Sequence, residues 1–227
     1  EKTPLSLYPE LKGVPGADAP CGAVFSVEIP AFSPYRHLPG ESLRDGRPGK
    51  TLSILTARNE IGSAAFLLFP MKAEKQAVFE VSPLSDGKNT IPASAIDLRV
   101  VHYWYQAGTA WSSYFADPLG KELVPELLLH GEDLLKTDMA KKDNFLRVGE
   151  NYLWISYPEE LEYGRFNYVL APVRDASRLT AFSLKPGVRK RFFLTVRLPK
   201  DAVPGCYSGT LTLKAGGKTL ETLSLIV

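Results

Sequence analysis

The chain has 227 residues, with 27 Lys and Arg against 25 Asp and Glu, and 44% of its residues are apolar. It is long enough and apolar enough to bury a sizeable core, which argues against wholesale disorder. The nearly balanced charge argues against a nucleic-acid-binding protein, and the sequence contains no apolar run of about 18 residues that would span a membrane.

Taken in chain order, the first part of the sequence predicts one strand between two irregular segments. Residues 1–20 contain four prolines and are expected to form an irregular, partly extended entry segment. Residues 24–29 carry four apolar side chains and stop at Pro30, which is typical of a strand. Residues 33–50 are polar and rich in Pro and Gly, which indicates a long loop.

The next stretch predicts further strands. Residues 51–56 alternate weakly between polar and apolar, whereas residues 76–84 and 96–106 alternate clearly, as strands with one buried face do. Residues 63–69 form a nearly continuous apolar run, which indicates a strand buried on both faces.

Residues 117–138 interrupt this rhythm because they are rich in leucine and contain Pro125. We expect an excursion here with at most a turn or two of helix, in which Pro125 would occupy the first turn. Residues 144–158 predict a strand hairpin, and residues 159–179 mix a polar loop with an apolar run at 168–170.

The last third of the sequence predicts four strands in a meander, with Gly216 and Gly217 at a tight hairpin. Strands recur at roughly 8 to 12 residues, which is the rhythm of a sandwich or barrel. We therefore predict an all-β, antiparallel β-sandwich, immunoglobulin-like or jelly-roll-like, with long loop insertions. It would form one module over residues 1–227, with an internal boundary near 174–180 that separates a larger sandwich (1–175) from a terminal β-meander (176–227).

The two ends of the sequence suggest a piece of a longer protein. Glu1 opens the chain without Met and no signal peptide is visible, so we expect a processed or trimmed product. Val227 ends an alternating apolar strand, whereas termini are usually exposed and frayed, so we expect a module that continues into another domain. A terminal strand that simply completes the protein is the alternative.

The two cysteines, Cys21 and Cys206, fit no metal-binding or redox spacing because no C-x-x-C pair is present. They are either buried free thiols or one disulfide that joins the first strand to one of the last. A disulfide closing so long a loop would contribute roughly 4 to 5 kcal/mol in the chain-entropy description.

Six of the sixteen residues from 100 to 115 are aromatic, which suggests a surface for a flat ligand. Sugar rings stack on aromatic rings through their apolar C–H faces, so the candidate carbohydrate-binding residues are Trp111, Tyr114, Trp104 and Tyr105. The alternative is that Trp104 belongs to the core and Trp111 anchors its loop onto the sandwich.

No catalytic residue, metal site or cofactor is expected from the sequence. Acid–base catalysis of glycoside cleavage needs two carboxylates across a cleft, and the spacing of the acidic residues in the middle of the chain enforces no such geometry. These candidates, explained more simply as solvated charges or turn formers, are Asp117, Glu122, Glu126, Asp133 and Asp138.

Other polar groups also have plain explanations. The acidic run at 159–162 is expected to be exposed, with calcium binding as the alternative. His37, His102 and His130 are far apart in the sequence and show no zinc-ligand spacing. The basic cluster at 187–193 is interpreted as a solvated strand end. No G-x-S-x-G nucleophile motif is present.

Pieces of the sequence at 56–70, at 100–115 followed by 123–138, and at 192–213 resemble the N-terminal β-sandwich region of large secreted bacterial proteins, next to a glycoside hydrolase domain. The sequence is similar to family 123 glycoside hydrolases and related hydrolase-like proteins. The resemblance implies an accessory domain, with the paired acidic catalytic residues on a barrel that this chain does not contain. No catalytic residue carries over to this sequence.

The leading hypothesis is a non-catalytic accessory module of a secreted, periplasmic or cell-surface carbohydrate-active enzyme. Its partners would be the downstream catalytic domain of the same polypeptide, which it packs against and orients, and a glycan contacted near Trp111, with no nucleic acid and no membrane span. A stand-alone carbohydrate-binding or adhesion domain is the alternative. The third hypothesis is that the chain is itself a hydrolase that uses Asp117 or Glu126.

Overall fold

The computed structural model describes residues 2–107, 120–155 and 173–227. It confirms the predicted all-β, antiparallel, sandwich-like fold. The strands are β1 (Val24–Ile29), β2 (Arg47–Pro48), β3 (Thr51–Ser53), β4 (Ile61–Pro70), β5 (Glu74–Val81), β6 (Leu84–Ser85), β7 (Thr90–Ile91), β8 (Ile96–Ala107), β9 (Lys121–Leu129), β10 (Leu135–Asp138), β11 (Asp143–Val148), β12 (Asn151–Trp154), β13 (Phe182–Leu184), β14 (Lys190–Arg197), β15 (Ser208–Ala215) and β16 (Lys218–Ile226).

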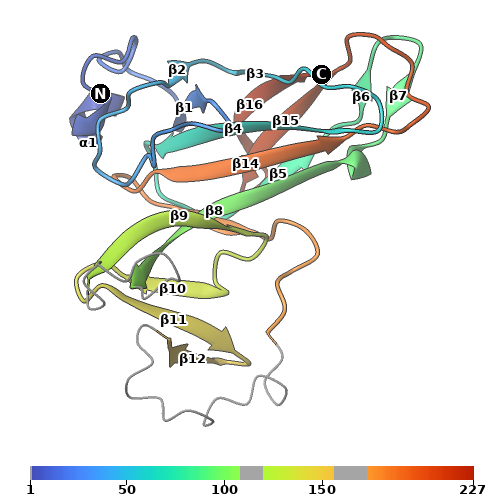
Figure 1. Cartoon of the computed structure of the whole chain (residues 1–227). Coiled ribbons are helices and arrows are strands. Elements are labelled where there is room, and N and C mark those ends of the chain that lie inside the picture. Colours follow the sequence, from blue (N-terminus) through green and yellow to red (C-terminus); the bar gives the residue numbers. More distant parts are fainter. Residues whose placement is uncertain (1, 108–119, 156–172) are drawn as a thin grey trace.

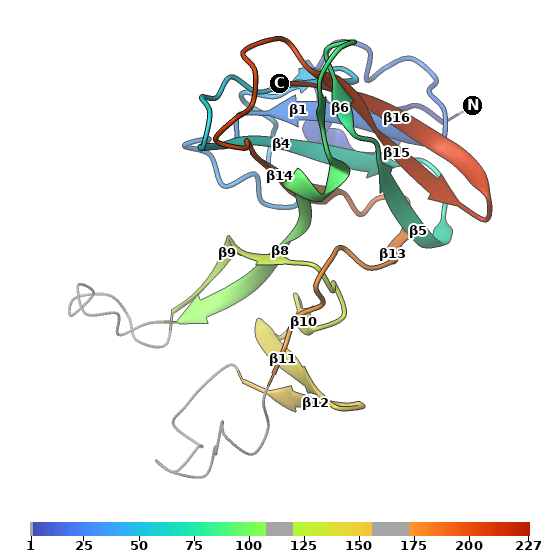
Figure 2. The same ribbon diagram turned by 90° about the vertical axis from the view of Figure 1, so that its right-hand side faces the viewer.

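Two sheets pack face to face and a third, smaller sheet lies beside them (Figures 1 and 2). The first sheet has the order β2-β1-β4-β14-β8-β9. The second has the order β13-β5-β15-β16-β3, with β6 paired to β15 and β7 paired to β6. The small sheet has the order β10-β11-β12. Within the described residues every strand pair is antiparallel except β16 with β3.

Strand β4 is buried on both faces, as its apolar run predicts. One face carries Ala64, Phe66 and Leu68 into the core between the two large sheets. The other face carries Ala65, Leu67 and Phe69 beneath the N-terminal segment. Four aromatic rings meet in the inter-sheet core, with neighbouring centroids 5.2 to 5.9 Å apart: Phe66, Phe79, Phe182 and Phe192.

The N-terminal segment covers the outer face of β4 with short helical turns, α1 (Pro4–Leu7) and η1 (Pro9–Leu11), rather than with mainly extended chain. A third short turn, η2 (Ala93–Ala95), precedes β8. The first helix begins at a proline after Thr3, whose side chain accepts a hydrogen bond from the Ser6 N–H. Prolines in this segment therefore start helical turns as well as break regular structure.

The expectation of at most a turn or two of helix in the leucine-rich stretch is wrong, because β9 is a strand paired with β8. Pro125 lies on an edge strand, where the register shifts between His102 and Trp104. Proline cannot donate to a ladder, so a bulge on an edge strand is the place in a sheet that accepts it. The leucines of β9 therefore lie on a paired strand and not on a helix.

The predicted terminal meander is also wrong in part. β15 and β16 form the expected hairpin, with φ of 55° at Gly216 and 75° at Gly217, the left-handed values that such a two-residue turn requires. However, β14 lies in the other sheet, between β4 and β8. Strands β13 to β16 therefore contribute to both large sheets. Period-two alternation is the same in either sheet, so it cannot show this crossing.

The small sheet contains the hairpin predicted for 144–158, in which β11 pairs with β12 around Gly149. It is joined to the sandwich through β8. The Asn144 side chain accepts a hydrogen bond from the Tyr105 N–H (2.9 Å) and donates one to the Tyr105 carbonyl (2.6 Å). This side-chain amide mimics a strand partner and fixes the small sheet to the far part of β8. Among the described helices, none is long and apolar enough to cross a membrane.

Candidate functional site

A cavity of about 710 Å³ lies between the sandwich and the small sheet, and we call it the inter-sheet cavity. Its walls come from β8, the segment that leads into β14, β10, and the loop around Pro39 and Gly40. Its volume is within the range of small-molecule sites. The apolar part of the lining is formed by Val100, Val101, Leu135, Met139, Tyr152 and Val188.

The charged lining of the inter-sheet cavity is mainly basic. Five cationic side chains line it: Lys136, Lys185, Arg189, Lys190 and Arg191. Three carboxylates also line it, and each has a cation beside it. Glu10 lies 3.9 Å from Arg189, and Glu132 pairs with Lys190, whereas Asp133 pairs with Arg147, which is not in the lining. Lys136, Lys185 and Arg191 have no ion pair within the described part of the chain.

Three side chains from the sandwich hold three consecutive carbonyl groups of the loop that borders this cavity. Arg191 donates to the Arg36 carbonyl (3.1 Å), Tyr103 donates to the His37 carbonyl (2.8 Å), and Arg189 donates to the Leu38 carbonyl. The loop therefore crosses β8 and the start of β14 and is held there by these three hydrogen bonds.

The two arginines in this arrangement are buried, with 6% of Arg189 and 8% of Arg191 exposed. Among the described residues, neither Nε of these arginines nor Nη1 of Arg189 has a hydrogen-bond partner. Burial lowers the pKa of Arg189, and the charge of Arg191 adds to this effect, whereas Tyr103, Glu10 and Glu41 oppose it.

His102 lines the cavity as a neutral imidazole. Burial lowers its pKa to about 4, with Glu132 opposing the shift and Lys190 adding to it. The Thr137 hydroxyl donates to the Tyr103 carbonyl (2.8 Å), so its oxygen accepts the hydrogen bond from His102 Nε2 (3.2 Å). The proton of the neutral ring therefore lies on Nε2, which ties β8 to β10.

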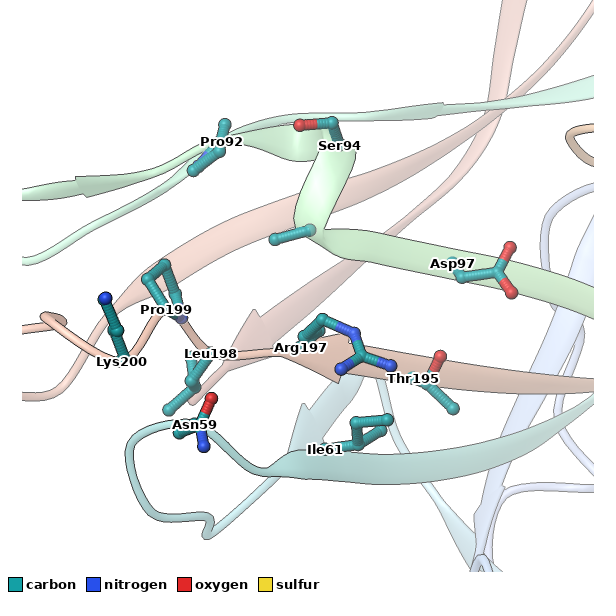
Figure 3. Close-up of a pocket in the computed structure, with 11 residues that line it drawn as sticks. Asn59, Ile61, Pro92, Ser94, Asp97, Thr195, Arg197, Leu198, Pro199 and Lys200 are labelled. Atoms are coloured by element: carbon teal, nitrogen blue, oxygen red, sulfur yellow. The ribbon is translucent and has the colours of Figure 1, made fainter.

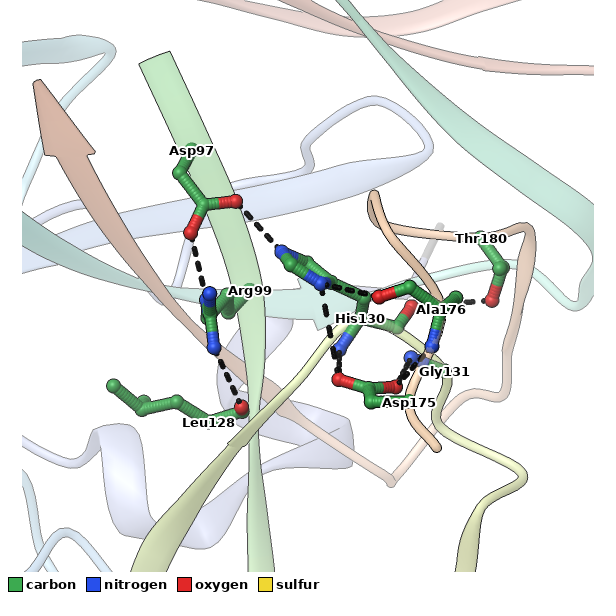
Figure 4. Close-up of polar contacts among 8 residues, drawn as sticks. All are labelled: Asp97, Arg99, Leu128, His130, Gly131, Asp175, Ala176 and Thr180. Atoms are coloured by element: carbon green, nitrogen blue, oxygen red, sulfur yellow. Dashed lines mark hydrogen bonds and ion pairs between the residues drawn. The ribbon is translucent and has the colours of Figure 1, made fainter. Parts of the chain in front are cut away.

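A second polar cluster surrounds His130, in the connection from β9 to β10 (Figure 4). Its Nε2 lies 2.6 Å from Asp97 Oδ1, and its Nδ1 lies 2.7 Å from the Ala176 carbonyl. Asp175 accepts backbone N–H groups from His130 (2.7 Å), Gly131 (2.9 Å) and Ala176 (2.8 Å). These bonds join three segments of the chain, including the one that the sequence marks as an internal boundary. Every polar group drawn in this cluster has a partner, which is typical of a structural hub.

The pocket in Figure 3, about 460 Å³, lies on the outer face of the first sheet. Asp97, Thr195 and Arg197 point toward it from β8 and β14, and Asn59 and Ile61 border it (Figure 3). It contains no buried polar group without a partner among the described residues. The inter-sheet cavity is therefore the stronger candidate site.

The structure describes two of the four aromatic residues that the sequence groups as a candidate sugar platform. Trp104 and Tyr105 are half-buried on β8, and the buried indole N–H of Trp104 finds no acceptor among the described residues. Tyr105 is tied to the small sheet through its backbone. Trp111 and Tyr114 lie outside the described residues.

The acidic candidates each have a local partner. Glu122 pairs with Arg36 (2.9 Å), Glu126 accepts from Gln106, Asp133 pairs with Arg147, and Asp138 accepts the N–H groups of the turn that follows it. Asp117 and the acidic run 159–162 lie outside the described residues.

The histidines also stay apart. The His37 ring contacts Asp45 (3.0 Å) and Ser33 (3.1 Å), whereas the rings of His102 and His130 have other partners. Burial lowers the pKa of His37, and Asp45 opposes this shift. No group of three or more His, Cys, Asp or Glu side chains within the described ranges is placed to hold a metal ion.

Both cysteines are free thiols, so of the two alternatives the structure has free thiols and no disulfide between Cys21 and Cys206. They are not buried as that alternative expected, because Cys21 is half-buried and Cys206 is exposed. Burial raises the pKa of the Cys21 thiol, and Glu221 adds to the rise, whereas Lys50 opposes it.

Sequence reasoning missed the arginines of the inter-sheet cavity. The basic cluster at 187–193 was expected to be solvated, but Arg189 and Arg191 are buried. The only signal that marks them is a run of three basic residues directly before Phe192 and Phe193 at the start of a strand. It does not reveal the loop that covers them.

The chain matches no known family profile and no curated protein sequence. Its structure is similar to that of a family 123 glycoside hydrolase from Clostridium perfringens, which was analysed for glycolipid glycan hydrolysis. The TM-score is 0.51 at 10% sequence identity, and the match covers 90% of this chain and 26% of the hydrolase. The chain thus spans about a quarter of that protein's length, and the likeness concerns the fold.

Proposed function

We propose that this chain is a non-catalytic β-sandwich module of a larger, secreted carbohydrate-active protein, in which it packs against a catalytic domain and contacts glycan. One observation carries the proposal: nearly the whole chain matches only about a quarter of a glycoside hydrolase. A unit of that size, with its own core between two sheets, is typical of a domain within a longer chain.

The charges around the inter-sheet cavity support a role in binding rather than in catalysis. Glycoside hydrolysis needs one carboxyl group held protonated and a second one facing it across the bond to be cleaved. Here Glu10, Glu132 and Asp133 each lie beside a cation. Each carboxylate is therefore engaged with a basic side chain, which differs from two carboxyl groups that face each other across a bond to be cleaved.

The test uses the isolated 227-residue chain and a panel of p-nitrophenyl glycosides. We expect release of p-nitrophenol no faster than in buffer, together with saccharide binding by calorimetry. Turnover that is lost in Asp117→Asn or Glu126→Gln, both of which preserve side-chain shape, would show that the chain is itself a hydrolase. Absence of binding to every saccharide tested would remove the glycan contact from the proposal.

A further inference from the structure

The inter-sheet cavity carries an excess of positive charge that its own carboxylates do not neutralise. Lys190 lies beside Glu132, and Arg189 lies beside Glu10. Arg191, by contrast, has no carboxylate within 4.0 Å in the described part of the chain. Its guanidinium donates to the Arg36 carbonyl and contacts the Tyr103 hydroxyl, both uncharged groups, and its Nε has no partner among the described residues. A buried cation without a counter-ion is costly, and a bound anion would relieve that cost.

The rim of the cavity adds two more free cations. Lys136 on β10 and Lys185 before β14 are exposed, line the cavity and have no ion pair among the described residues. A concave site lined by charges of one sign concentrates ligands of the opposite sign. His102 adds no charge near neutral pH, because its pKa is about 4.

The remaining lining is apolar and includes one exposed aromatic ring. Tyr152 is 41% exposed, and Met139 and Val188 beside the cavity are also exposed. Such a surface suits the apolar C–H face of a sugar ring, whereas the cations suit a charged substituent on that ring. A purely inorganic anion would leave the apolar wall unused.

From this combination we infer that the inter-sheet cavity is a binding site for an acidic sugar, a pyranose ring that carries one carboxylate or sulfate group. Arg191, Lys136 and Lys185 would face the negative group, and Tyr152 would contact the ring. The sugar ring in this inference rests on the proposed function, whereas the negative charge rests on the cavity alone.

The inference can be tested by calorimetric titration of the full chain at pH 7 and low salt with four probes: glucuronic acid, glucose 6-sulfate, glucose and sodium sulfate. We expect the two acidic sugars to bind at least about tenfold more tightly than glucose or sulfate, since one charge-assisted hydrogen bond to a ligand accounts for such a factor. Lys136→Gln and Lys185→Gln should each weaken acidic-sugar binding by several-fold, to about tenfold, and leave glucose unaffected.

Lys218→Gln is the matched control, because Lys218 is exposed at the β15–β16 hairpin and has no ion pair in the described structure. It should bind like the wild type. The two cavity lysines are exposed, so their variants should fold even if Arg191→Gln does not.

Three other binding results would each overturn a different part of the inference. Equal affinity for glucose and glucuronic acid removes the charge selectivity but leaves a glycan-binding module. Equal affinity for sulfate and glucose 6-sulfate removes the sugar ring, and no binding of any probe removes the site. Hydrolysis of glycosides by the chain, by contrast, would overturn the proposed function without touching acidic-sugar binding.

Discussion

His130 Nε2 lies 2.6 Å from Asp97 Oδ1, and this contact joins the connection between β9 and β10 to the first strand residues of β8 (Figure 4). The other ring nitrogen lies 2.7 Å from the Ala176 carbonyl. A carbonyl and a carboxylate are both acceptors, so the His130 ring lies between two acceptors on different segments of the chain. Burial raises the pKa of Asp97, but hydrogen bonds from Arg99 and His130 outweigh this and lower it overall, so the carboxylate is ionised.

The first prediction concerns this contact. His130→Gln should lower the free energy of unfolding by roughly 2 kcal/mol, because one amide cannot reach both acceptors and a buried partner loses its donor. Urea denaturation measures this directly. Arg99→Gln is the matched control, since Arg99 holds the same Asp97 carboxylate (2.7 Å) from a half-exposed position. Arg99→Gln should lower the free energy of unfolding by less than about 1 kcal/mol. Equal costs for the two variants would show that the histidine is not a hub.

The second prediction concerns pH and His102. Its pKa falls from 6.5 in the unfolded chain to about 4 in the fold, so protonation favours unfolding. The stability from the neutral ring is therefore complete above pH 6.5 and is lost as pH falls from 6.5 toward 4. The loss is on the order of 3 kcal/mol.

The measurement is urea denaturation of the wild type and of His102→Gln at several pH values between 7 and 4. The variant should lose about 3 kcal/mol less over this range. Because His37 is present in both proteins, its own titration cancels in the difference. Identical pH profiles would contradict the assignment of a neutral, buried His102.

The sequence was sufficient to predict the class of fold, because apolar residues at every second position show which face of a strand is buried. It predicted the doubly buried β4 and the Gly216–Gly217 turn, where only a local pattern is needed. It did not predict which sheet β14 joins, since a strand has the same alternation in either sheet. It also mistook β9 for a stretch with helix, because Pro125 weighs against a central strand but not against an edge bulge.

The candidate site was harder to predict for a physical reason. The inter-sheet cavity forms from segments far apart in the sequence, and neither Arg191 nor Lys136 lies in a recognisable motif. The aromatic stretch was conspicuous by composition, yet Trp104 and Tyr105 are half-buried on β8. Whether a charged side chain is solvated or buried depends on the loop that covers it, which local patterns do not encode.

The third prediction tests close packing between the end of β15 and the β5–β6 connection. A methyl group added at Gly209 would lie 2.8 Å from the Pro83 carbonyl oxygen and 2.7 Å from Leu84 Cδ2. Backbone must move to relieve this, so Gly209→Ala should destabilise the protein by about 1 to 3 kcal/mol in thermal or urea unfolding. Gly22→Ala is the control, because no atom lies within 4 Å of the added group and φ there is not positive. If both variants match the wild type, the close approach at Gly209 is absent.

The fourth prediction concerns how the N-terminal segment is held on the sandwich. The Tyr8 hydroxyl donates to the Pro70 carbonyl (2.7 Å) at the end of β4 and accepts from the Gly187 N–H (3.0 Å) before β14. Burial raises the pKa of Tyr8 to about 12, so the phenol stays neutral in ordinary buffers.

Tyr8→Phe keeps the ring that packs edge-on against Phe69 and removes only the two hydrogen bonds. It should lower the free energy of unfolding by about 1 to 3 kcal/mol, because a buried carbonyl loses its donor while no apolar contact changes. Tyr35→Phe, at an exposed ring, is the matched control and should change stability by less than about 0.5 kcal/mol. Equal effects in urea denaturation would mean that apolar burial alone holds the segment. A larger loss in Tyr8→Phe than in Tyr35→Phe would mean that one hydroxyl fixes the entry segment to two neighbouring strands, β4 and β14, at one end of the first sheet.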